Sequence, residues 1–163
     1  FHYLKNEFLL ENRDGAIQGL RELIDSGEMG MDVRLKGKCY LQLGKWLKEQ
    51  MTEVNETDCL EIEKAFKYAT ELSSDRCNTW HYYGLINFEM THHYDRMPKG
   101  STLAEDVEEN IDYHLLNAIQ GFIKSISLAN RISLQDILRL LTLWFKLGDR
   151  KSVQSTFPDG MDQ

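Results

Sequence analysis

The chain is poor in proline and cysteine, and neither residue type is placed where it would shape a small disulfide-bonded or all-β fold. Only 2 of its 163 residues are proline, and its 11 glycines are scattered along the sequence. Because the tight turns of all-β folds depend on proline and glycine, this profile favours long helices. The 3 cysteines (Cys39, Cys59 and Cys77) are spaced too widely for a disulfide framework or a zinc set. We therefore expect reduced thiols and a cytoplasmic protein.

Positively charged residues are fewer than negatively charged ones. The chain has 19 Lys and Arg residues and 26 Asp and Glu residues, which gives a net charge of −7. Surfaces that bind nucleic acids or anionic membranes need basic patches, so we expect neither partner. The most apolar stretch, near the C-terminal end, is interrupted by Asp136 and Arg139. We therefore expect no transmembrane segment.

Sequence motifs for enzyme chemistry are missing as well, including a glycine-rich phosphate loop and the kinase, hydrolase and metalloprotease signatures. Adjacent side chains such as His92 and His93 point about 100° apart on a helix, so they cannot easily share a metal ion. His81 and His114 have no neighbour at ligand spacing. We expect no catalytic residue, metal or cofactor in this chain. Glu89 follows an apolar run, and we expect it in a structural ion pair with Lys or Arg rather than as a general base.

Apolar residues at helical spacing are abundant, and they predict an all-α solenoid of degenerate tetratricopeptide (TPR)-like or HAT-like helix pairs, an α-α superhelix. We expect one helical-repeat domain over residues 1–163, with helix pairs over about 1–30, 32–72, 76–129 and 133–150 and a flexible loop over about 96–103. Ser133 and Asp136 form a capping box at the start of the last helix, and Gly148 is predicted to end it.

Two stretches match the TPR pattern of an aromatic residue followed by Leu or Tyr and then Gly, namely Tyr40–Gly44 and Trp80–Gly84. We expect each glycine to let the paired helix approach closely. The predicted structural core consists of Tyr40, Leu43, Gly44, Trp46, Phe66, Trp80, Tyr83, Gly84, Phe122, Ile126, Leu141, Trp144 and Phe145.

The last helix is predicted to be apolar on two faces. One face comprises Leu134, Ile137, Leu138, Leu141, Trp144 and Phe145, and the other comprises Leu140, Leu143 and Leu147. A helix that is apolar on most sides must be covered on most sides. Stacked helical repeats provide that setting, because each pair packs between two neighbours.

Three stretches resemble the FAT region of the target-of-rapamycin (TOR) type of phosphatidylinositol-3-kinase-related protein kinases. They are "CYLQLGKW" (Cys39–Trp46), "TWHYYGLINFE" (Thr79–Glu89) and "AIQGFIKSISLANRISLQDILRLLTLWFKLG" (Ala118–Gly148). The resemblance implies a non-catalytic regulatory scaffold that clamps a downstream serine/threonine kinase domain in nutrient and growth signalling. ATP and Mg would then belong to that kinase domain, in a longer polypeptide.

The resemblance also implies partners: the kinase domain of the same polypeptide, neighbouring helical repeats and the protein subunits of a signalling complex, with recruitment to endomembranes as one location. Family members bind an inositol polyphosphate at positions that match Lys38, Gln42 and Thr79. Only Lys38 is basic, so it is the single candidate ligand and further cations would have to come from elsewhere.

Two alternative functions remain open at this point. The chain could be a free-standing TPR-like adaptor that binds protein segments in its groove, which would require polar helices at both ends. It could also be the FAT region of a pseudokinase that serves as a transcriptional scaffold. The residues alone do not separate the latter from an active kinase.

Overall fold

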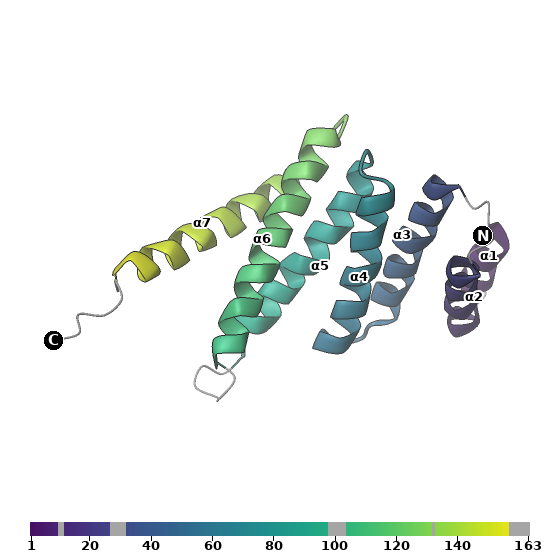
Figure 1. Cartoon of the computed structure of the whole chain (residues 1–163), viewed down its shortest axis with the longest axis horizontal. Helices are drawn as coiled ribbons and strands as arrows, with labels where there is room; N and C mark the ends of the chain where they lie inside the picture. Colours follow the sequence, from purple (N-terminus) through teal and green to yellow (C-terminus); the bar gives the residue numbers. More distant parts are fainter. Residues whose placement is uncertain (10–11, 27–31, 98–103, 132, 157–163) are drawn as a thin grey trace.

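A computed structural model describes residues 1–9, 12–26, 32–97, 104–131 and 133–156, and every regular element in these ranges is an α-helix. The helices are α1 (His2–Leu9), α2 (Arg13–Asp25), α3 (Val33–Gln50), α4 (Glu56–Leu72), α5 (Cys77–Asp95), α6 (Ala104–Leu128) and α7 (Leu134–Thr156). They stack side by side, with α1 and α7 at opposite ends of the row (Figure 1). The predicted all-α solenoid is therefore confirmed. Among the described residues, no helix combines the length and apolar character that a membrane span requires.

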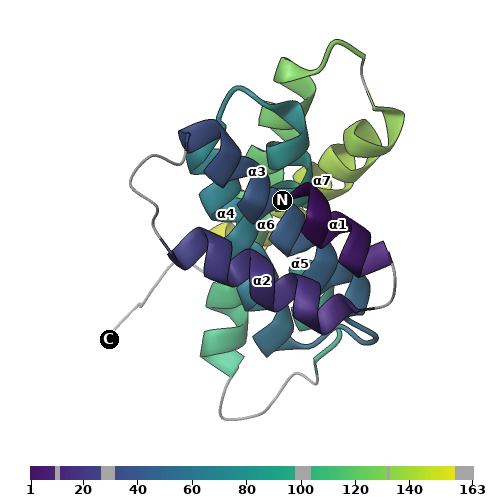
Figure 2. The ribbon, with the colours of Figure 1, turned by 90° about the vertical axis from the view of Figure 1, so that its right-hand side faces the viewer.

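The helices pack as consecutive pairs, α1 with α2, α3 with α4 and α5 with α6, and α7 lies against α6. Figure 2 shows the row from the end formed by α1 and α2. Side chains also link alternate helices along the row. The ion pairs that do so are Arg21–Glu61 between α2 and α4, Lys48–Glu89 between α3 and α5, and Lys146–Asp95 between α5 and α7. Helices α2, α3, α4 and α5 are thus held both to their pair partners and to an alternate helix along the row.

The core consists of three apolar clusters. Each cluster fills a contact between neighbouring helices, which we call a joint of the stack. The first joins α1, α2 and α3 around Leu20 and Trp46, and the second joins α4 and α5 around Phe66. The third joins α6 to α7 around Phe122 and Leu143. Phe66 and Phe122 are fully buried. Burying one such side chain contributes about 1.5–3 kcal/mol, so every joint has its own source of stability.

Glycines set the spacing within two of the pairs, as the sequence predicts for Gly44 and Gly84. A Cβ atom on Gly44 would lie 2.5 Å from the ring of Phe66 in α4. Gly84 of α5 faces Gly121 of α6 so closely that a Cβ on Gly121 would lie 2.5 Å from the Cα of Gly84. No side chain fits at either place, because these distances are shorter than ordinary van der Waals contact.

The prediction of a core position is wrong for three residues of α7. Leu141 is 48% exposed, Trp144 is 60% exposed and Phe145 is 70% exposed. The cause is the rotation of α7, which packs on α6 through its other apolar face, around Leu143. No described helix covers the face that carries Leu141, Trp144 and Phe145.

The other predicted core residues lie inward to different degrees. Leu43, Trp46, Phe66, Tyr83 and Phe122, together with the two glycines, are buried. Tyr40 and Trp80 are half-buried against the first and second clusters. Ile126 is half-buried as well. Tyr40 and Trp80 therefore lie at the edges of the clusters, whereas Trp46 of α3 and Tyr83 of α5 lie inside them.

Two helix limits differ from the prediction. The prediction that Gly148 ends the last helix was wrong, because α7 continues to Thr156. A glycine inside a helix costs only about 1 kcal/mol relative to alanine. Arg150, half a turn further on, forms an ion pair with Asp112 of α6 at 2.6 Å, which holds this part of α7 in place. The Ser133–Asp136 start was correct, since the backbone amide of Asp136 donates to the Ser133 hydroxyl at 3.3 Å.

The second difference is at α4, which begins at Glu56, whereas Asp58 with Glu61 three residues later predicts a start near Asp58. Asn55 is its N-cap, because the side-chain oxygen of Asn55 accepts the backbone amide of Asp58 at 2.9 Å. The predicted flexible loop cannot be compared in full, because residues 98–103, including Pro98 and Gly100, lie outside the described residues.

The glycine contact between α5 and α6 predicts opposite effects of the same substitution at two helical glycines. Gly121→Ala should lower the free energy of unfolding of the chain by about 3 kcal/mol, because the new methyl group meets backbone that cannot move aside. Gly148→Ala should raise it by about 0.5–1 kcal/mol, because no atom lies within 4 Å of the new Cβ and alanine favours the helix. Denaturant titration measures both. Equal effects at the two positions would contradict the close approach.

Candidate functional site

A pocket of about 640 Å³ lies between the C-terminal half of α3, the connection to α4, and α5. Both of its lysines are engaged inside the chain. Lys48 forms the ion pair with Glu89, and the ammonium group of Lys45 lies 4.4 Å from the centre of the Tyr82 ring. The structural ion pair that the sequence predicts for Glu89 is therefore confirmed. The pocket's cations hold α3 against α5, and this pairing leaves them poorly placed to bind an anionic ligand.

The three positions that match the inositol-polyphosphate pocket do not form one basic surface. Lys38 is exposed, and Gln42, one turn further along α3, lines the pocket described above. Thr79 is 1% exposed, and its hydroxyl donates to the carbonyl oxygens of Ser73 and Arg76 at 3.1 and 2.7 Å. The Thr79 hydroxyl thus stabilises the turn between α4 and α5, and Lys38 remains the only cation of the three positions.

A buried polar network around His114 joins α6 to α5. The side chains of His114 and Asn87 are 1% and 0% exposed, and Nδ1 of His114 lies 2.7 Å from Oδ1 of Asn87. The amide nitrogen of Asn87 donates to the carbonyl of Tyr83 at 2.9 Å, so its Oδ1 must accept. Burial lowers the pKa of His114 to about 4, which makes the ring neutral at pH 7. His114 therefore donates from Nδ1 and fixes the register of α6 on α5.

A buried carboxyl group continues this network into α4. Glu63 is 6% exposed, and the Tyr113 hydroxyl of α6 donates to it at 3.2 Å. Burial raises the pKa of Glu63, and the hydrogen bond from Tyr113 partly opposes that shift. Burial and the nearby Glu63 charge together raise the pKa of Tyr83. Such shifts are the expected result of desolvation at a structural joint.

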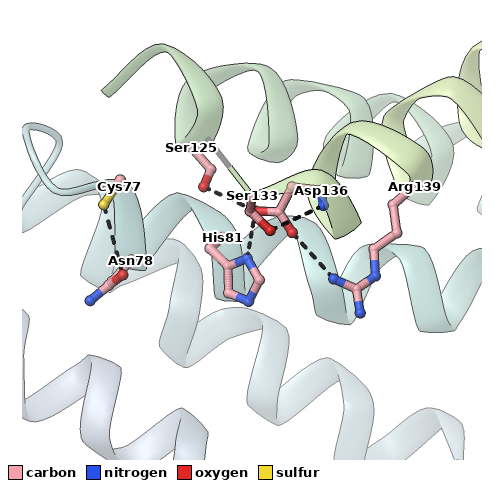
Figure 3. A network of polar contacts seen from close by, with 7 residues as sticks. All are labelled: Cys77, Asn78, His81, Ser125, Ser133, Asp136 and Arg139. Carbon is pink, nitrogen blue, oxygen red and sulfur yellow. Dashed lines mark hydrogen bonds and ion pairs between the residues drawn. The ribbon is translucent and has the colours of Figure 1, made fainter. Parts of the chain in front are cut away.

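A second buried carboxylate, Asp136, connects α5, α6 and α7 (Figure 3). Its side chain is 3% exposed. Oδ2 lies 2.8 Å from Nδ1 of His81 in α5 and accepts from the Ser125 hydroxyl of α6 at 3.4 Å. Oδ1 accepts from Arg139, three residues further along α7, at 3.2 Å. These contacts occupy both oxygens of Asp136, and they fix the first turn of α7 to the α5–α6 pair.

The contacts of the histidines and cysteines indicate packing roles rather than metal binding or nucleophilic chemistry. Among the described residues, no group of three or more His, Cys, Asp or Glu side chains could hold a metal ion. His92 and His93 contact different aromatic rings, those of Phe88 and Tyr94. Burial raises the pKa of the Cys59 thiol to about 11, so it stays protonated and is a weak nucleophile.

The residues that organise the joints were largely missed by the sequence analysis. Gly121 is a single glycine inside a long apolar helix, which is a usable signal for close packing. Asp136 was recognised as a capping residue, but its contacts with α5 and α6 were not. His114 and Asn87 give no pattern of their own, because they meet only when α5 and α6 pair.

The low pKa of His114 predicts a pH dependence. An unfolded histidine titrates near pH 6.5, whereas His114 in the folded chain titrates at about 4. Between these values the unfolded state binds more protons, so the stability from this residue is complete above about pH 6.5 and is lost as the pH falls toward 4. Relative to a His114→Gln variant, the wild-type chain should lose about 3 kcal/mol over this range. Urea titrations from pH 4 to pH 7 measure it, and parallel pH profiles would contradict the buried neutral ring.

The Asp136 contacts predict that neutralising Asp136 lowers the free energy of unfolding more than neutralising Asp112, although both carboxylates lie at the α6–α7 joint. Asp136→Asn should lower the free energy of unfolding by about 1.5–3 kcal/mol, because charge-assisted hydrogen bonds to His81 and Arg139 are lost in a buried place. Asp112→Asn breaks the Arg150 pair, whose carboxylate is 42% exposed, and should cost less than about 1 kcal/mol. Denaturant titration compares the two, and a cost at Asp136 no larger than that at Asp112 would contradict the assignment.

Comparison with known proteins agrees with this architecture. The FAT domain family matches residues 1–142. The serine/threonine-protein kinase tor1 of Schizosaccharomyces pombe is 35% identical over 147 residues, which cover 90% of this chain and 6% of that protein. The serine/threonine-protein kinase mTor of Drosophila melanogaster is 30% identical over 142 residues, covering 80% of this chain and 6% of that protein.

A plant relative gives the same result. The serine/threonine-protein kinase TOR of Arabidopsis thaliana is 31% identical over 136 residues, or 80% of this chain and 5% of that protein. The chain thus spans only about one-twentieth of the length of the relatives it matches. On the family match and these identities, the chain belongs to the FAT domain family and is a regulatory helical segment of the TOR kinase type.

Proposed function

We propose that this chain is a regulatory scaffold that restrains the kinase domain of a TOR-like serine/threonine protein kinase in nutrient and growth signalling. ATP and Mg would bind in that kinase domain, and the chain would contact it as a clamp. Its other partners would be neighbouring helical repeats and the protein subunits of a signalling complex. The protein would act in the cytoplasm, with recruitment to endomembranes as part of its signalling.

The observation that carries this proposal is how the joints of the stack are built. The joints among α4, α5, α6 and α7 combine apolar clusters with buried or half-buried polar contacts, namely those of Glu63, His114 and Asp136. Polar contacts of this kind are directional, so they hold one relative orientation of the helices better than apolar packing alone. A stack that keeps its shape can resist the motion of a neighbouring domain, which is what a clamp must do.

The test uses the whole polypeptide that carries this chain, purified from its own cells. Phosphorylation of serine and threonine in a protein substrate should depend on ATP and be abolished by an ATP-site inhibitor. Gly121→Ala should raise kcat by about twofold or more, because a looser α5–α6 joint restrains the kinase less. The Michaelis constant for ATP should stay unchanged, since the site of ATP binding is untouched. Gln120→Ala, at the exposed neighbouring position, is the control and should behave as wild type.

Two results would contradict the proposal. Intact, folded protein without kinase activity would favour the pseudokinase scaffold. An active kinase whose kcat is the same with Gly121→Ala and with Gln120→Ala would leave the chain as a structural segment without a restraining role.

A further inference from the structure

A smaller cavity of about 310 Å³ lies at the joint between the first two helix pairs, where α2 faces α3 and α4. Three of its lining residues, Ile24, Leu43 and Ala65, belong to the buried apolar cluster of this joint. Small-molecule sites in proteins have volumes of about 300–1,000 Å³ and combine an apolar lining with a few polar groups. This cavity therefore has the size and lining of a site for one small molecule.

Two tyrosine rings line the cavity beside this apolar cluster. Tyr40 of α3 and Tyr68 of α4 have their ring centres 5.0 Å apart and their planes tilted by 33°. Tyr40 is half-buried and Tyr68 is 39% exposed, so the pair offers aromatic surface to a ligand. Such a surface suits an apolar side chain, and an aromatic one above all, because aromatic rings attract one another in offset and tilted contacts.

Charged groups of both signs line the cavity in equal number, two cations and two carboxylates. Arg21 of α2 and Glu61 of α4 form an ion pair with each other. Asp25 lies about one turn beyond Arg21 on α2, and Lys64 lies about one turn beyond Glu61 on α4. Neither Asp25 nor Lys64 forms an ion pair with another described residue. One carboxylate on α2 and one ammonium group on α4 are therefore available to a ligand.

The Asp25 carboxylate and the two rings face the same space. Burial raises the pKa of the Tyr40 phenol, and the phenol of Tyr68 and the negative charge of Asp25 raise it further. Such an effect requires that the three groups lie near one another. A ligand that touches the rings can therefore reach the Asp25 carboxylate as well.

The balance of charge in the lining indicates the kind of ligand. A phosphate group is held by several cations, and Lys64 is the single lining cation without a partner among the described residues. In the described part of the chain no group of three or more His, Cys, Asp or Glu could hold a metal ion. A small zwitterion with an apolar side chain fits better, because it pairs with Asp25 and Lys64 at once and covers the rings.

We propose that this cavity binds a free amino acid with an apolar side chain. The α-ammonium group of the ligand pairs with Asp25, and its α-carboxylate pairs with Lys64. Its side chain lies against the rings of Tyr40 and Tyr68, next to the buried cluster. The ligand thereby joins α2 to α4 as the Arg21–Glu61 ion pair does one turn away. The inference rests on the cavity and is independent of the proposed regulatory role.

The first test needs no variant and uses the whole polypeptide with L-phenylalanine as the probe. Saturation-transfer difference NMR, which detects weak ligands of large proteins, should show transfer to the phenylalanine ring protons. 3-Phenylpropionate lacks the ammonium group and 2-phenylethylamine lacks the carboxylate, so each should bind at least about tenfold more weakly. Glycine lacks the side chain and should bind as weakly as they do. No transfer to L-phenylalanine, or equal binding of 3-phenylpropionate, would overturn the inference.

Variants of the same polypeptide place the binding in this cavity. Asp25→Asn and Lys64→Gln should each raise the Kd for L-phenylalanine at least about tenfold, because each removes one charge-assisted contact. Glu22→Gln and Lys67→Gln are the matched controls, on the same two helices but outside the cavity lining, and should bind as wild type. All four positions are exposed, so the buried cluster is untouched. An unchanged Kd in both Asp25→Asn and Lys64→Gln would assign the amino acid to another part of the polypeptide and overturn the inference.

Discussion

The contact between Gly84 and Gly121 is the constraint on which the centre of this stack depends. At this point the backbones of α5 and α6 approach so closely that a Cβ on Gly121 would lie 2.5 Å from the Cα of Gly84, and a Cβ on Gly84 would lie 3.1 Å from the backbone nitrogen of Phe122. The two glycines each cost about 1 kcal/mol of helix propensity. In return, the short distance brings Phe122 into complete burial and brings His114 within hydrogen-bond reach of Asn87. The burial of Phe122 and the hydrogen bond between His114 and Asn87 therefore both depend on the short distance between α5 and α6.

In the described part of the chain, buried polar groups form hydrogen bonds between helices at the joints of the stack. Asp136 receives hydrogen bonds from α5, α6 and α7, and Glu63 receives one from α6. Burying a charge costs free energy unless it is fully paired, so such groups penalise any other arrangement of the helices. A stack built in this way resists shear between neighbouring pairs. This property matters more for a regulatory scaffold than the total stability of the chain.

The features that could be predicted from the sequence are those whose signal lies within a single helix. Helical spacing identified the helices, and the aromatic-to-glycine pattern identified the close approach at Gly44 and Gly84, because both signals lie within one helix. The choice between the two apolar faces of α7 could not be made, because it depends on the surface that α6 presents. The bonds of Asp136 to His81 and Ser125 were missed for the same reason, since they join residues from separate helices.

Two predictions about α7 were wrong. Gly148 was taken as a helix end, because glycine after an apolar run often ends a helix. In the structure Gly148 is an exposed glycine in the interior of α7. Trp144 was placed in the core because large aromatic residues are usually covered, yet no described helix covers its face of α7.

Native-state hydrogen exchange tests the central claim, that the glycine contact makes the α5–α6 pair the most stable part of the chain. The backbone amides around Gly84 and Gly121 should exchange slowest, by complete unfolding. Those of α7 between Trp144 and Gly148 should exchange about 100-fold faster, by local opening of a helix covered on one side only. Exchange in α7 as slow as in the middle of α5 would contradict the account.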